Sequence, residues 1–108
     1  MTCPPEVDPA IVVPLVAEID LTNCEQAYHE LNAASACAAT VVIADFTATW
    51  FCDCASLRYL LAVQRRAGAQ GGQLRVVIPP GSLVRRVADL IGLPGRLAVY
   101  SSVSEASA

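Results

Sequence analysis

The hydrophobic positions of this chain fall into alternating strand-length and helix-length segments. Uninterrupted or β-branched apolar runs predict strands at 11–17, 40–46, 73–78 and 96–100. Between them, apolar residues recur at helical spacing in segments that begin near residues 22, 54 and 83. The order β-α-β-α-β-α-β predicts an α/β fold whose mainly parallel sheet is connected by right-handed crossovers.

The first strand and helix carry the clearest local signals. Pro14 places the first strand at a sheet edge or a bulge, and the polar segment 18–20 is expected to end it. Thr22 and Glu25 have capping-box spacing, which predicts a helix start. The apolar stripe of this helix consists of Cys24, Ala27, Leu31, Ala34 and Ala38. His29 lies off the stripe and is expected at the surface.

The second and third helices also have predictable ends. Gly68 or the Gly71-Gly72 pair is expected to close the second helix. The third helix should end at Gly92, with Pro94 beyond it. Its expected apolar positions are Leu83, Val87, Leu90 and Ile91.

Length and composition favour one globular domain. The chain has 108 residues, of which 55% are hydrophobic and 16% charged, so it can bury a core without metal or disulfide support. We expect a single domain over 1–108, with an irregular segment at 1–10. Residues 103–108 either form a further helical turn or fray, and the sequence leaves both open.

Charge and hydropathy narrow the possible partners and the location. The net charge is −3, all seven basic residues are arginine, and they form no basic stripe, which argues against nucleic acid as a partner. The N-terminus does not resemble a signal peptide, and the apolar runs are too short to span a bilayer. We therefore expect a cytoplasmic protein without direct membrane insertion.

The five cysteines are an odd number for a disulfide framework, so free thiols are expected. Zinc sites usually need paired C-x-x-C spacing or a cysteine-histidine set. This chain offers only Cys52-x-Cys54, a distant Cys3 and the single His29. We predict no metal site and no cofactor. Because a C-x-x-C motif, a glycine-rich phosphate loop and a base paired to a nucleophile are also missing, we predict that the protein is not an enzyme.

The turn at 51–57, Phe-Cys-Asp-Cys-Ala-Ser-Leu, holds the most informative chemistry. Asp53 precedes an apolar-periodic helix and is the expected N-cap. Cys54 then takes the first helical position, close to the positive end of the helix dipole. Ser56 takes the third. Trp50 and Phe51, just before the turn, are expected to pack in the core or at its rim. The alternative is an exposed aromatic beside a partner surface, which is a typical binding hot spot.

Five segments in register resemble the STAS-domain anti-sigma-factor antagonists, also called anti-anti-sigma factors, of bacteria. They are residues 17–20, 41–46, 51–57, 71–74 and 84–93. The resemblance covers nearly the whole chain from about residue 11. It implies a four- or five-stranded, mainly parallel sheet with packed helices, and a partner-binding surface at the start of the second helix.

The resemblance also implies site residues. The family's turn is carried over onto Asp53, Cys54, Ala55, Ser56 and Leu57, and its upstream partner-contacting aspartate onto Asp20. The partner would be an anti-sigma factor, a kinase-like protein, and binding would regulate sigma-factor-dependent transcription. In the family, that kinase phosphorylates a serine at the position of Cys54 and so ends the binding. Here the acceptor position carries a thiol.

Several interpretations of the thiol at position 54 stay open. The domain binds its partner constitutively, with Cys54 as a serine-sized interface residue. Alternatively, oxidation of Cys54 controls binding, with Cys52 as the nearest resolving thiol. In a third reading, phosphorylation moves to Ser56 or Thr49. A separate alternative is a soluble STAS accessory subunit of a membrane transporter.

Overall fold

A four-stranded parallel sheet organises the computed structural model, which describes residues 10–38 and 40–107. Its strands are β1 (Ala10–Pro14), β3 (Val41–Asp45), β5 (Gln73–Val77) and β6 (Ala98–Tyr100), in the order β1-β3-β5-β6. β1 lies at an edge and Pro14 is its last residue, so the edge placement predicted from this proline is confirmed. Ile43 and Ala44 on β3 are fully buried, as a central strand requires.

Two further short strands pair beside the sheet. β2 (Glu18–Ile19) runs parallel to β4 (Phe51–Cys52), with Ile19 opposite Cys52. The expectation that 18–20 is only a polar break is therefore wrong, because Ile19 is fully buried and its strand joins the turn segment.

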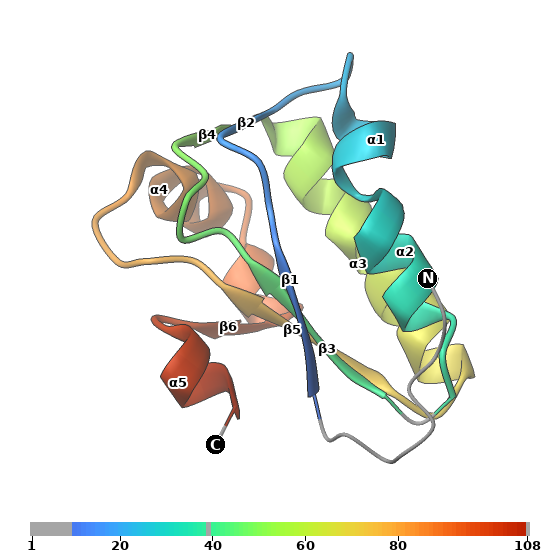
Figure 1. Ribbon diagram of the computed structural model, residues 1–108. Helices are drawn as coiled ribbons and strands as arrows, with labels where there is room; N and C mark the ends of the chain where they lie inside the picture. The colour runs from blue at the N-terminus through green and yellow to red at the C-terminus, as the bar shows by residue number, and fades with distance from the viewer. Residues whose placement is uncertain (1–9, 39, 108) are drawn as a thin grey trace.

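The helices cover the two faces of the sheet unequally (Figure 1). α2 (His29–Ser35), α3 (Cys54–Ala69) and α4 (Leu83–Leu90) pack their buried residues into one cluster with Val42, Ala44 and Val76 of the sheet. The opposite face carries α5 (Val103–Ser107), whose Ala106 packs on Ile43 and Val77. The tail thus forms a helical turn over 103–107. A 3-10 turn at Leu93–Gly95 links α4 to β6.

The first predicted helix is divided, and it does not start with a capping box. α1 (Cys24–Ala27) is capped by Asn23 without a side-chain bond, and Tyr28 separates it from α2. The Thr22 hydroxyl instead donates to Asp20 Oδ1 at 2.5 Å, so it closes a turn. Within the stripe, Leu31 and Ala34 are buried as expected, whereas Ala38 is exposed. His29 is exposed, which confirms its predicted surface position.

The apolar face of α4 also differs from the prediction. Its buried residues are Val84 and Ala88, while Leu83 and Leu90 are 48% and 80% exposed. The face that α4 turns to the core is thus centred on Val84 and Ala88, with the expected Val87 and Ile91 packed at its side. Ser82, whose side chain accepts the amide of Arg85, caps the start of the helix.

Gly72 is required by a close approach between two chain segments. A Cβ at this position would collide with the backbone of Thr40, and Gln73 N donates to Thr40 O at 3.1 Å across the same contact. Gly71 has φ of +76°, a conformation that favours glycine. The glycine pair therefore lets α3 turn directly into β5, after α3 has ended at Ala69.

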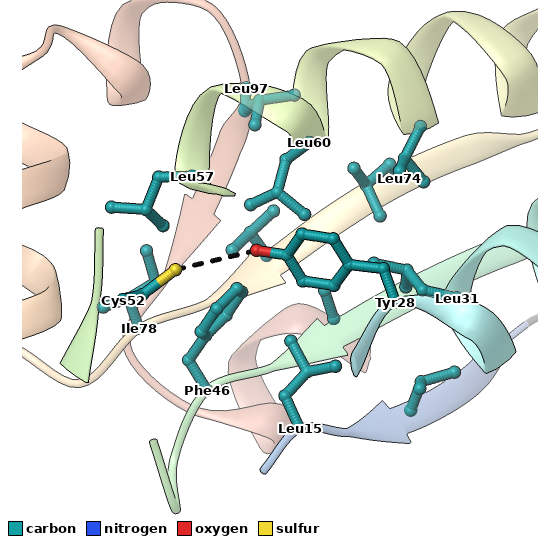
Figure 2. Close-up of a cluster of buried hydrophobic side chains, with 14 of the residues drawn as sticks. Leu15, Tyr28, Leu31, Phe46, Cys52, Leu57, Leu60, Leu74, Ile78 and Leu97 are labelled. Atoms are coloured by element: carbon teal, nitrogen blue, oxygen red, sulfur yellow. Dashed lines mark hydrogen bonds between the residues drawn. The ribbon is translucent and has the colours of Figure 1, made fainter. Parts of the chain in front are cut away.

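Tyr28 joins the α1–α2 junction to the start of α3 inside the core. Its ring is fully buried and its hydroxyl donates to Ser56 O at 2.9 Å. The same hydroxyl lies 3.7 Å from Cys52 Sγ, a contact drawn in Figure 2. One buried side chain thus connects the first helical segment, β4 and the first turn of α3.

Replacing Tyr28 by phenylalanine should lower the free energy of unfolding by about 1 kcal/mol, because the substitution removes the buried hydroxyl that donates to Ser56 O. Urea denaturation followed by circular dichroism measures the change. Tyr100→Phe, on the opposite sheet face, is the matched control and should cost less. Equal losses in the two variants would contradict the role assigned to Tyr28.

Candidate protein-binding site

The 51–57 turn is held in place by the β2–β4 pair. Asp53 N donates to Ile19 O at 3.1 Å, directly after the register pair of Ile19 and Cys52. This pairing brings the segment that carries Asp20 beside the segment that carries Asp53, although the two residues are far apart in the sequence. The structure therefore places the predicted upstream aspartate next to the turn.

Asp53 is the N-cap of α3, as the sequence predicts. Its backbone is extended, with φ of −73° and ψ of 166°, and its Oδ1 accepts the amide of Ser56 at 2.8 Å. Its Oδ2 accepts the amide of Leu21 at 3.2 Å. One carboxylate thus fixes both the start of α3 and the loop between β2 and α1.

Asp20 organises its own loop. Its Oδ1 accepts the amide of Thr22 at 2.9 Å as well as the Thr22 hydroxyl, and its backbone amide donates to Asn23 Oδ1 at 2.8 Å. The hydrogen bond from the Thr22 hydroxyl is the main cause that lowers the pKa of Asp20 below its ordinary value. The Asp20 carboxylate is therefore held ionised and in a fixed position beside the turn.

The residues carried over from the family divide into exposed and buried groups. Cys54 and Ala55 are exposed on the first turn of α3, whereas Ser56 and Leu57 are fully buried. Ser56 Oγ has no hydrogen-bond partner among the described atoms. Ser56 and Leu57 thus anchor the turn from within, and of the carried-over residues on α3 only Cys54 and Ala55 are exposed to a partner in this conformation.

The two alternative phosphorylation positions are both inaccessible. Ser56 is fully buried, and Thr49 is 4% exposed with its hydroxyl donating to Val16 O at 2.7 Å. A kinase needs a hydroxyl that reaches its active site, so phosphorylation at either residue would require the turn to open. The structure gives no support to a displaced phosphosite.

The thiols near the turn differ in environment. Cys54 is exposed, Cys24 is half-buried and Cys52 is buried, and all three are free. Burial is the main cause that raises the pKa of Cys52 to about 12, although its contact with Tyr28 acts in the opposite direction. Because the thiolate is the reactive form, Cys52 is poorly suited to resolve an oxidised Cys54.

Two further findings concern the cysteines. Cys37 is disulfide-bonded, so the expectation of free thiols throughout is wrong for this residue. Cys3 lies outside the described residues. Within residues 10–38 and 40–107, no group of three or more histidine, cysteine or acidic side chains is arranged to hold a metal ion.

Two large apolar side chains near the turn are exposed. Leu21, which sequence reasoning missed, is 73% exposed on the loop that Asp53 holds. Trp50 is 58% exposed just before β4, so the alternative of an exposed aromatic applies to it and core packing does not. Leu21 could have been suspected from its polar neighbours Asp20 and Thr22.

No helix in the described part of the chain is both long and apolar enough to span a bilayer.

Replacing Asp53 by alanine should cost about 1 kcal/mol of stability, as the loss of an N-cap commonly does. The loss should be smaller in Asp53→Asn, since asparagine still caps a helix but has one carbonyl oxygen instead of two acceptors. Urea denaturation of both variants measures the difference. An alanine variant as stable as the wild type would contradict the assigned cap.

Among the cysteines that the structure describes, iodoacetamide at pH 8 should alkylate Cys54 first and Cys52 last, because only Cys54 of these is both free and exposed. Peptide mass spectrometry over time measures the order.

The raised folded pKa of Cys52 also makes the stability of the fold depend on pH. The contribution of Cys52 to the free energy of unfolding is complete below about pH 8.5, the unfolded thiol pKa, and declines as the pH rises further. Early labelling of Cys52 would overturn this description.

Comparisons with known proteins agree with the geometry. Searches of curated proteins find no significant match. A candidate anti-sigma factor antagonist of Thermotoga maritima superposes with a TM-score of 0.66 at 18% identity, over 93% of this chain and 86% of that one. The phosphorylated form of the Bacillus cell fate determinant SpoIIAA superposes with a TM-score of 0.56 at 20% identity, over 91% and 87%. Both likenesses show the fold. The sequence profile of the STAS domain matches residues 4–106, and the chain therefore belongs to the STAS-domain family.

Proposed function

We propose that this STAS domain is an anti-sigma-factor antagonist that binds its partner at the 51–57 turn without a phosphorylation switch at position 54. The observation that carries the proposal is the exposed Cys54 at the first position of α3, beside the fixed carboxylates of Asp20 and Asp53. The partner is an anti-sigma factor with kinase activity, and its capture regulates sigma-factor-dependent transcription.

Electrostatics explains why a phosphate at this position would act as a switch. Phosphorylation adds roughly −1.5 to −2 charges and a bulky group. At position 54 these charges would lie next to the Asp53 carboxylate and close to the Asp20 loop. In a close interface, repulsion and desolvation of this kind favour dissociation.

A thiol is similar in size to the serine hydroxyl, but it does not undergo the phosphorylation reaction. Cysteine is not a substrate of a serine kinase, so the wild-type surface stays in its binding-competent state. We therefore propose constitutive binding. The contact surface would comprise Asp20, Cys54 and Ala55, with Ser56 and Leu57 supporting it from the core.

We further propose that the domain acts by binding and not by catalysis. The exposed thiol lies on an open helix turn, and the neighbouring Cys52 is buried and held neutral by its raised pKa. Such a pair is poorly suited to thiol redox turnover, which needs an accessible second thiol. These features support a surface that recognises another protein.

Cys54→Ser should restore the switch that the wild type lacks. Purified anti-sigma factors from the source genome are incubated with ATP and with wild type, Cys54→Ser or the neighbouring control Ala55→Ser. Intact mass and pull-down are then measured. We expect wild type and Ala55→Ser to stay unmodified, and Cys54→Ser to gain one phosphate and lose binding.

Two results would contradict the proposal. If none of the anti-sigma factors binds the wild type, the proposed function is wrong. If the wild type is phosphorylated, peptide mapping identifies the modified hydroxyl, and binding is not constitutive.

A further inference from the structure

A groove of about 620 Å³ runs beside the edge strand, away from the first turn of α3. Its floor and walls come from the end of β1, the β1–β2 connection, α1, the start of α2 and Trp50. Among its lining residues are the apolar Val13 and Val16 and the polar Asn23 and Gln26. The groove is thus a composite of several segments, and none of its lining residues is a site residue that the family resemblance assigns.

Backbone hydrogen bonds position Trp50 at the rim of this groove. Its amide donates to Ala17 O at 2.9 Å, and the preceding Thr49 hydroxyl donates to Val16 O at 2.7 Å. Its ring lies 5.9 Å from the ring of Phe51, measured between centroids. Nevertheless 58% of Trp50 is exposed. A large aromatic side chain that stands open to solvent on a positioned backbone is a typical binding anchor.

The charged groups of the groove have one sign. Glu18 and Glu30 both line it, and none of the described lining residues is basic. A guanidinium can make two kinds of contact in such a site, because it pairs with carboxylates and also stacks on the face of an indole. Ammonium groups pair with carboxylates as well but lack the planar face.

We propose that this groove binds an arginine-bearing segment of the partner protein, with the guanidinium between Trp50 and the carboxylates of Glu18 and Glu30. The proposal rests on the proposed function, because it extends the same partner's contact beyond the 51–57 turn. Asn23 connects the two regions: it lines the groove, and its Oδ1 accepts the amide of Asp20 at 2.8 Å.

The test uses a fluorescein-labelled amphipathic dodecapeptide of arginine and leucine, compared with the same peptide carrying glutamate for arginine. Anisotropy gives Kd for the full chain, and Trp50, the single tryptophan, reports occupation through its own fluorescence. We expect saturable binding of the arginine peptide with a change in Trp50 emission. Glu30→Gln and Trp50→Ala should each raise Kd about tenfold, as loss of a hot-spot contact does.

Glu25→Gln is the matched control, because it removes the same charge from the neighbouring α1 but does not line the groove. Circular dichroism confirms folding of every variant, and Glu30→Gln decides the outcome if Trp50→Ala fails to fold. Three results would overturn the proposal: equal binding of the glutamate peptide, equal weakening by Glu25→Gln, or no binding of the arginine peptide.

Sedimentation of the chain alone tests a second copy as the occupant. A dimer that Trp50→Ala dissociates would replace the proposed partner segment and overturn the inference. The anti-sigma factor separates the two proposals: if it binds wild type and Glu30→Gln equally, the groove proposal fails while the proposed function stands. If no anti-sigma factor binds, the proposed function fails and the peptide still decides the groove.

Discussion

Asp53 accepts two backbone amides, from Ser56 at 2.8 Å and from Leu21 at 3.2 Å, and the geometry of the proposed binding surface follows from this one carboxylate. The first bond fixes where α3 begins, so that Cys54 takes the first helical position and faces solvent. The second bond fixes the loop that carries Asp20. The β2–β4 pair and the Tyr28 hydroxyl support the same arrangement from the core side.

The parts of the fold that follow from local chemistry could be predicted from the sequence. Asp53 before an apolar-periodic segment predicted the start of α3, and the β-branched run of 41–46 predicted the central strand. The placement of Pro14 at an edge followed from its missing amide hydrogen. These signals act through residues close together in the sequence, and the structure confirms them.

The features that depend on contacts between distant parts of the chain could not be predicted from local sequence signals. Ile19 becomes a strand residue only because Phe51 and Cys52 pair with its segment, and Thr22 closes a turn onto Asp20 where a capping box was expected. The way the chain passes from β4 into α3 decides which side chains are buried there. It buries Ser56 and Leu57 and leaves Trp50 exposed. Family resemblance pointed to the 51–57 turn as the candidate site, but it did not separate its exposed residues from its buried ones.

The proposed binding surface consists of a fixed loop, an exposed thiol and two carboxylates, and its residue at position 54 is not one that a serine kinase can modify. Hydrogen–deuterium exchange of the wild-type chain, with and without a purified anti-sigma factor, tests where that partner binds. We expect slowed exchange in the peptides that cover 18–24 and 50–58. Protection confined to α5, on the opposite face of the sheet, and to the edge strand β6 would contradict this binding site.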